Sequence, residues 1–250
     1  MTIITPSGGD SLEELAKACN ALYLCPKDAD GKRLGPLVPY AGKGPDGKNL
    51  VGDVYFNFRR IEEYPLVVES FAEQLLSKLL SPTRELTFDT VCGIPHGGRT
   101  LGQAFARVAK RRFVYADKVP IPTESGKKQE YVWDLSQFSF EQGESLLVME
   151  DVINNLQNTD KTLEEIAKTG ATVVYLGAGL NRSPFADKSY TPKTGLYANH
   201  VLPIVCAIRN PFPEYTQDDP AVSEDIAKGN IEWEVKKNWR RLVQAMNRAS

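Results

Sequence analysis

The chain has 250 residues, and its 30 lysines and arginines nearly balance its 32 aspartates and glutamates, which leaves a net charge of −2 at pH 7. Apolar residues make up 42% of the chain and charged residues 25%, as in ordinary globular proteins. This charge argues against a generic nucleic-acid binder, and no run of about 18 apolar residues marks a membrane span. The start, MTIITPSGGDSLEELAKA, lacks a basic segment followed by an apolar one, so we expect no signal peptide.

The cysteines are scattered and form no CxxC pair, so we expect neither a disulfide framework nor a zinc site. Cysteines of this kind are typical of a cytoplasmic protein, which is the location we expect. They are Cys19, Cys25, Cys92 and Cys206.

The first quarter of the chain alternates short elements with turns. Residues 11–18 form a predicted helix, with Asp10 or Ser11 as its cap. Glycine and proline punctuate residues 26–52, which indicates loops and short strands, and residues 54–58 are a predicted strand. An apolar stripe at helical spacing then predicts a helix through Val67, Phe71, Leu75 and Leu79.

From residue 88 onward, apolar strands alternate with helices, a pattern that predicts a mostly parallel sheet flanked by helices. One helix carries Leu101, Phe105 and Val108, and a second begins after Asp160 as its cap and ends near Gly170. The predicted strands are 88–94, 113–116, 145–149, 172–180 and 200–208.

Two segments leave alternatives open. Residues 117–143 show no periodicity, which indicates either a mobile functional loop or a hairpin insertion around YVWDL. In the tail, an apolar stripe at helical spacing favours a packing surface over a cofactor-binding face. The stripe consists of Ile231, Val235, Trp239, Leu242 and Met246.

Polar residues follow three of the predicted strands, where ligands bind in open parallel sheets. Glu150 and Asp151 follow the strand 145–149, residues 95–99 follow another, and Asn181 and Arg182 follow a third. We expect these three groups to converge at one edge of the sheet.

The adjacent carboxylates Glu150 and Asp151 are the sharpest signal. Their burial is costly unless they meet hydroxyls, donors or a cation. The loop after them feeds a helix N-terminus, which favours phosphate binding, and together these features fit a phosphorylated sugar with magnesium nearby. The alternative interpretation is that Asp151 merely forms a turn and the asparagines after it are plain loop residues.

The segment LLVMEDVINNLQNT resembles the ribosyl-pyrophosphate signature of the type I phosphoribosyltransferases. The segments VYFNFRRI, FDTVCGIPHGGRTLGQAFA, FVYADK and TGATVVYLGAGLNRS also resemble orotate phosphoribosyltransferase in order and spacing. The resemblance implies an α/β fold with a mostly parallel twisted sheet flanked by helices. It further implies an N-terminal hood (1–60), a catalytic core (61–208) and a C-terminal helical extension (209–250).

The resemblance also implies site residues. Glu150 and Asp151 would hold the ribose hydroxyls of phosphoribosyl pyrophosphate (PRPP) and meet Mg²⁺ mainly through PRPP and water. Lys118, Lys127 and Lys128 would add catalytic cations, the last two from a loop that closes over the site. Phosphate would be bound by Asn154, Asn155, Leu156, Gln157, Asn158 and Thr159, pyrophosphate by His96, Gly97, Gly98 and Arg99, and the base by Arg182, Phe56 and Tyr40.

Structural interpretations compete with several of these roles. Arg182 could form an ordinary ion pair, Phe56 could belong to the core, and Lys127 and Lys128 could be a solvated pair. His96 suits the stabilisation of a turn better than general-base catalysis, because pyrophosphate can depart with the help of magnesium.

The sequence also departs from the family pattern. The phosphate loop 154–159 lacks glycine and is one residue longer than Thr-Thr-Gly-Gly-Ser/Thr, although glycine suits a backbone that wraps around phosphate. Asp117 stands where the family has arginine, and Asn181 where it has aspartate. Tyr40 is near the position of a base-contacting lysine, and Ser125-Gly126-Lys127-Lys128 replaces a Lys-x-His-Gly ending.

The resemblance implies magnesium-dependent transfer of phosphoribose from PRPP to a nucleobase. Orotate is the first candidate for the base, with orotidine monophosphate and pyrophosphate as the products. The implied assembly is a homodimer. The departures keep three alternatives open: another base as acceptor, a catalytically weakened nucleotide-binding regulatory paralogue, and a pure scaffold.

Overall fold

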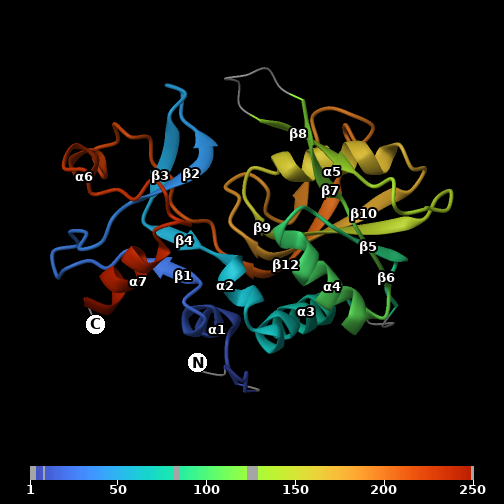
Figure 1. Cartoon of the computed structure of the whole chain (residues 1–250), viewed down its shortest axis with the longest axis horizontal. Helices are drawn as coiled ribbons and strands as arrows, with labels where there is room; N and C mark the ends of the chain where they lie inside the picture. The colour runs from blue at the N-terminus through green and yellow to red at the C-terminus, as the bar shows by residue number, and fades with distance from the viewer. Residues whose placement is uncertain (1–3, 8, 81–84, 123–128, 249–250) are drawn as a thin grey trace. The chain divides into compact units, whose positions relative to one another are not determined.

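A computed structural model describes residues 4–7, 9–80, 85–122 and 129–248 (Figure 1). The chain divides into two compact units, one formed by Met1–Glu63 with Pro211–Ser250 and the other by Tyr64–Asn210. The hood and the C-terminal extension of the sequence analysis therefore fall almost wholly in one unit. In the described part of the chain, no helix has both the length and the apolar character that crossing a membrane requires.

Within its described residues, the unit Tyr64–Asn210 contains a six-stranded sheet in the order β11-β12-β10-β9-β5-β6. Neighbouring strands are parallel except β11, which runs antiparallel to β12. All five strands predicted in this region are confirmed, because each is a short apolar run of the kind that parallel sheets bury. The strands are β5 (Thr90–Gly93), β6 (Arg112–Tyr115), β9 (Ser145–Ile153), β10 (Thr172–Asn181), β11 (Ser189–Tyr190) and β12 (Leu202–Arg209).

Helices α3 (Pro65–Leu79) and α4 (Gly97–Ala109) pack together on one face of this sheet, and α5 (Gln157–Ala167) covers the other (Figure 1). The apolar stripe predicted for α3 is confirmed, since Val67, Phe71 and Leu75 are fully buried. On the α5 face, the buried core includes Leu146 and Val148 of β9.

Part of the segment 117–143 is a hairpin, as one of the two interpretations predicted, and whether it has a function is not settled by this pairing. Strand β7 (Asp117–Ile121) pairs antiparallel with β8 (Glu130–Asp134). Trp133 of β8 and Leu135, directly after the strand, join the buried core on the α5 face of the sheet. The hairpin is therefore part of the packed unit over these residues, while residues 123–128 lie outside the described part of the chain.

In the other unit, β1 (Leu22–Leu24) pairs antiparallel with β4 (Val54–Phe56), and β2 (Val38–Lys43) with β3 (Asn49–Gly52). This arrangement confirms loops and short strands for residues 26–52. Ser11 and Glu14 form a capping box at the first helix, so Ser11 rather than Asp10 is the cap. The helices of this unit are α1 (Leu12–Ala18), α2 (Phe58–Glu62), α6 (Ser223–Ala227) and α7 (Trp239–Arg248).

The tail stripe is a packing surface, as predicted. Val235, Trp239 and Leu242 are buried against the core of their own unit. The helix α7 begins only at Trp239, however, and Ile231 lies outside it because Leu37 engages the backbone on both sides: the Leu37 N–H donates to the Asn230 carbonyl oxygen, and the Leu37 carbonyl oxygen accepts from the Glu232 N–H. Residues in a strand-like bridge cannot also form helical hydrogen bonds.

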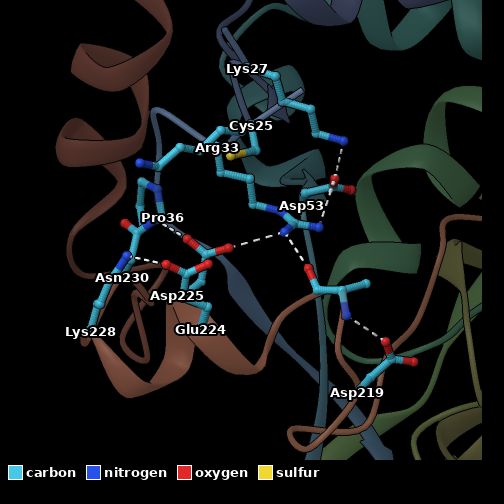
Figure 2. A network of polar contacts seen from close by, with 12 residues as sticks. Cys25, Lys27, Arg33, Pro36, Asp53, Asp219, Glu224, Asp225, Lys228 and Asn230 are labelled. Carbon is cyan, nitrogen blue, oxygen red and sulfur yellow. Dashed lines mark hydrogen bonds and ion pairs between the residues drawn. The ribbon is translucent and has the colours of Figure 1, made fainter. Parts of the chain in front are cut away.

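A network of charged side chains ties the C-terminal segment to the first part of the chain (Figure 2). The Arg33 guanidinium lies 3.1 Å from the Asp225 carboxylate and 3.6 Å from that of Asp53, which Lys27 also contacts at 2.8 Å. Arg33 donates as well to the Ala221 carbonyl oxygen at 2.7 Å. Buried charges are tolerated only when paired in this way, so the C-terminal segment around Ala221 and Asp225 is an integral part of this unit.

Candidate active site

Strand β9 continues through the adjacent acids Glu150 and Asp151 to Ile153, so the predicted end of the strand at Met149 is wrong. The reason is the pairing with β10, in which Glu150 lies opposite Ala178 and the ladder extends to the last residue of β9. On the other side, β5 ends at Gly93, opposite Met149. The two acids therefore lie on a strand that outruns one of its neighbours.

Successive side chains of a strand point to opposite faces of the sheet, so the two acids separate. Glu150 faces α5, where its Oε2 accepts a hydrogen bond from the Thr159 hydroxyl at 2.9 Å. Asp151 faces α4, since a Cβ atom placed on Gly97 would lie 2.0 Å from its Oδ2. Each acid thus lies beside the first turn of a different helix.

Burial raises the pKa of Glu150 well above its usual value, and the neighbouring charge of Asp151 raises it further, while the Thr159 hydrogen bond acts in the opposite direction. A positive charge beside the pair would favour the ionised form. The two carboxylates are therefore more easily ionised together when a ligand brings a cation into the site than when the site holds no cation.

This raised pKa gives a pH dependence. In the unfolded chain Glu150 ionises near its usual value, whereas the folded chain keeps the proton, so wild-type stability falls as the pH rises toward the folded pKa. Glu150→Gln does not titrate, and we expect its unfolding free energy to rise relative to wild type between about pH 5 and about pH 8. Urea unfolding at both pH values measures this, with the exposed Glu85→Gln as control. A constant difference between Glu150→Gln and wild type contradicts the burial of this carboxyl.

The predicted phosphate loop runs from Asn154 into the first turn of α5. The helix begins at Gln157 and not after Asp160, so the predicted cap is wrong. Asp160 instead accepts a hydrogen bond from the Tyr190 hydroxyl at 2.9 Å. The N-terminus of α5, with its outward N–H groups and partial positive charge, lies beside Glu150 through Thr159.

Leu156 precedes α5 in the left-handed conformation, with φ 59° and ψ 11°, although the family pattern places glycine in this loop. Its side chain is 2% exposed and belongs to the core on the α5 face. A left-handed backbone costs a non-glycine residue about 1–2 kcal/mol. Burial of the leucine side chain offsets this cost.

We therefore expect Leu156→Gly to be about 1 kcal/mol more stable than Leu156→Ala, because both lose the buried side chain but only alanine keeps the strain. At Leu163, which is buried within α5, the order should reverse by about the same amount. Chemical denaturation of the four variants measures both differences. The same order at the two positions contradicts a strained Leu156.

The predicted pyrophosphate turn leads into α4. His96 is exposed and precedes the helix, whose first turn contains Gly97, Gly98 and Arg99. This turn approaches β9 closely, because a Cβ atom on Gly98 would lie 2.1 Å from the backbone oxygen of Met149. Glycine is required here for contact between helix and strand, and the resulting helix N-terminus lies beside Asp151.

Arg99 is engaged by its own surroundings. Its Nη2 donates to the Ala116 carbonyl oxygen at 3.0 Å and to the Asp117 carboxylate, and its guanidinium lies 4.1 Å from the centre of the Tyr115 ring. The negative charge of Asp117 therefore balances the positive charge of Arg99. Lys118 lies 4.2 Å from the centre of the Tyr131 ring in the hairpin partner strand.

No protein-family model matches the chain. The orotate phosphoribosyltransferase of Wolinella succinogenes is 30% identical over 128 residues, 51% of this chain and 57% of that enzyme. The chain thus spans less than two thirds of the length of this relative. The orotate phosphoribosyltransferase of Campylobacter lari is 25% identical over 180 residues, 72% of this chain and 75% of that enzyme.

Among solved structures, the adenine phosphoribosyltransferase of Leishmania tarentolae aligns with a TM-score of 0.50 at 14% identity, over 82% of this chain and 90% of that one. The fold is that of the type I phosphoribosyltransferases. The resemblance to orotate phosphoribosyltransferase stated from sequence is likewise confirmed.

The remaining residues implied by the phosphoribosyltransferase resemblance lie in different parts of the chain. Arg182 is buried in the sheet-containing unit, and its backbone N–H donates to the Ile153 carbonyl oxygen at 3.0 Å. Tyr40 and Phe56 are buried in the other unit, where the Tyr40 hydroxyl donates to the Val54 carbonyl oxygen at 2.7 Å. Lys127 and Lys128 lie outside the described residues.

Over the described ranges, no cluster of three or more His, Cys, Asp or Glu side chains is placed to hold a metal ion. Mg²⁺ in phosphotransfer sites commonly takes one or two carboxylates together with substrate phosphates and water. Glu150 and Asp151 fit a cation that arrives with a phosphorylated ligand, because burial and the charge of Asp151 both raise the Glu150 pKa, and a nearby positive charge favours the ionised carboxylate.

Sequence reasoning missed the turn that follows β10. Asn181 Nδ2 donates to the carbonyl oxygens of Ala186 at 2.8 Å and Asp187 at 3.1 Å. Arg209 at the end of β12 donates to the Asn181 and Ser183 carbonyl oxygens and to the Asp187 carboxylate. The pairing register of β10 and β12 could have predicted this contact, because parallel strands that end at Asn181 and Arg209 place these two residues side by side.

Proposed function

We propose that the protein is a phosphoribosyltransferase that transfers phosphoribose from PRPP to a nucleobase. In this reaction the bond from the anomeric carbon to a pyrophosphate oxygen breaks, and pyrophosphate leaves with the electron pair. A base nitrogen forms the new bond to the same carbon, and the proton of that nitrogen passes to solvent.

One observation carries this proposal: adjacent acids on β9 lie beside the N-termini of two helices. Glu150 contacts Thr159 of α5, and Asp151 lies against Gly97 of α4. A helix N-terminus attracts phosphate, so two of them flanking a pair of carboxylates suit a sugar with a phosphate at each end. In our proposal the carboxylates hold the ribose hydroxyls and stabilise positive charge at the anomeric carbon in the transition state.

We include Mg²⁺ in the proposal, held by Glu150 and Asp151 mainly through PRPP and water. When bound, it neutralises the charge that develops on departing pyrophosphate. The chain's own share is to orient the substrate with these two acids and with the first turns of α4 and α5.

Orotate is our first candidate for the base, on the grounds of the named sequence relatives and of Arg182, whose guanidinium suits a carboxylate. The test is steady-state transfer from PRPP with Mg²⁺ to orotate, uracil, hypoxanthine and adenine. We expect orotate to be the fastest acceptor. Transfer to adenine or hypoxanthine at an equal or higher rate overturns the choice of base, and failure to bind PRPP overturns the whole proposal.

A weakened, nucleotide-binding paralogue is the second candidate function, and a specific contact favours it. Arg99, expected at pyrophosphate, is held by Asp117 and by the Ala116 carbonyl oxygen. Calorimetric binding of PRPP without turnover of any base supports this candidate. Turnover well above background excludes it.

A further inference from the structure

The turn from Asn181 to Asp187 is held at both ends and in its middle. The side chain of Asn181 bonds the turn at Ser183, Ala186 and Asp187. The Ser183 hydroxyl accepts the Ala186 N–H at 3.2 Å, and Arg209 reaches the turn through three donors at 2.7, 3.0 and 2.9 Å. Asn181 and Ser183 are fully buried, so these bonds are shielded from competing water.

This fixed turn carries Phe185, which is 62% exposed. In the described part of the Tyr64–Asn210 unit, it is the one aromatic among the large apolar side chains counted as exposed. A single exposed apolar side chain is ordinary. Phe185 differs from an ordinary exposed side chain because buried hydrogen bonds already hold the backbone of its turn in place. A ligand that binds the ring therefore does not have to order the turn.

The turn also adjoins the acid-bearing strand. Arg182 donates its N–H to Ile153, two residues beyond Asp151 on β9, at 3.0 Å. A strand advances about 3.3 Å per residue, so the turn begins within roughly 7 Å of the Asp151 backbone along the strand. Phe185 therefore belongs to the same edge of the sheet as the proposed PRPP site.

We propose that Phe185 is a base-contacting residue, whose ring stacks on the flat face of the acceptor nucleobase, and that Asn181 and Arg209 are positioning residues for it. This inference rests on the proposed function. Stacking suits any flat heterocycle, whereas the charge of Arg182 selects among them.

The experiment compares Phe185→Ala and Phe185→Tyr with wild type, using orotate and PRPP as probes. We expect Phe185→Ala to raise the KM for orotate about tenfold or more, in keeping with the loss of one aromatic–base stack, and to leave the KM for PRPP unchanged. Phe185→Tyr should restore the KM for orotate. Adenine replaces orotate if the acceptor panel favours it.

Leu196→Ala is the matched control, because Leu196 is 68% exposed but lies near the opposite, amino-terminal end of β10, where its neighbour Tyr197 accepts the Val173 N–H at 2.9 Å. It should change neither KM. An unchanged KM for the base in Phe185→Ala, or an equal rise for base and PRPP, overturns this inference while the proposed function stands. Wild type that binds no PRPP overturns both.

Discussion

Replacing Gly97 by alanine is expected to lower phosphoribosyl transfer by about 10²-fold, the order of loss seen when transition-state charge stabilisation is removed, and to leave the fold intact. An alanine Cβ at this position would lie 2.0 Å from Oδ2 and 2.2 Å from Cγ of Asp151. The atoms in the way belong to a short side chain, which can rotate aside. The carboxylate then loses its position beside α4 while the helix keeps its own, so unfolding free energy should change by less than about 1 kcal/mol.

Gly98→Ala is the matched control, with the opposite outcome. Its Cβ would meet the backbone oxygen of Met149 at 2.1 Å and the Glu150 Cα at 3.2 Å, and backbone cannot rotate aside. The helix must shift away from β9, and we expect a loss of about 3 kcal/mol or more of unfolding free energy.

Steady-state kinetics and urea unfolding of both variants, beside Asp151→Asn, separate the two effects. Asp151→Asn should reproduce the kinetic loss of Gly97→Ala without any steric change. Full activity in Gly97→Ala would remove Asp151 from the position described here. Equal stability of the two glycine variants would contradict the close approach of α4 to β9.

The sheet could be predicted from sequence because each strand is a short apolar run that is buried whatever its neighbour is. The end of β9 could not, since Glu150 and Asp151 stay extended only through pairing with β10. The same holds for the start of α5. Asp160 satisfies the local rule for a cap, but its carboxylate accepts a hydrogen bond from Tyr190, and the helix begins at Gln157, directly after the buried Leu156.

The charged residues show a second limit of sequence reasoning. The position of Asp117 in the sequence predicts a negative charge near pyrophosphate but not its partner, which in the structure is Arg99 of α4. Asn181 likewise reads as the replacement of an acid, but its amide makes two donations that a carboxylate cannot make. In both cases the partner is set by tertiary structure, and no helix or strand period relates the two residues.

Asn181→Asp, which restores the residue type of the family pattern, is expected to destabilise the protein by about 3 kcal/mol or more at about pH 8. The buried amide donates to the carbonyl oxygens of Ala186 and Asp187, and a carboxylate would face both with negative charge. Arg209 cannot compensate readily, since its Nε, Nη1 and Nη2 are already bonded within the turn.

The pH dependence separates lost hydrogen bonds from buried charge. Burial among acceptors should raise the pKa of the introduced carboxyl, so the variant loses stability as the pH rises from the ordinary aspartate pKa toward the raised one. Asn181→Ala loses the same donors without charge. We expect Asn181→Asp to be the less stable of the two at about pH 8 and at least as stable at about pH 4.5, where a protonated carboxyl can donate one bond. If the unfolding free energies of the two variants change with pH in parallel, the buried hydrogen bonds of Asn181 to the turn are contradicted. The ordered turn that carries Arg182 and Phe185 is then contradicted as well.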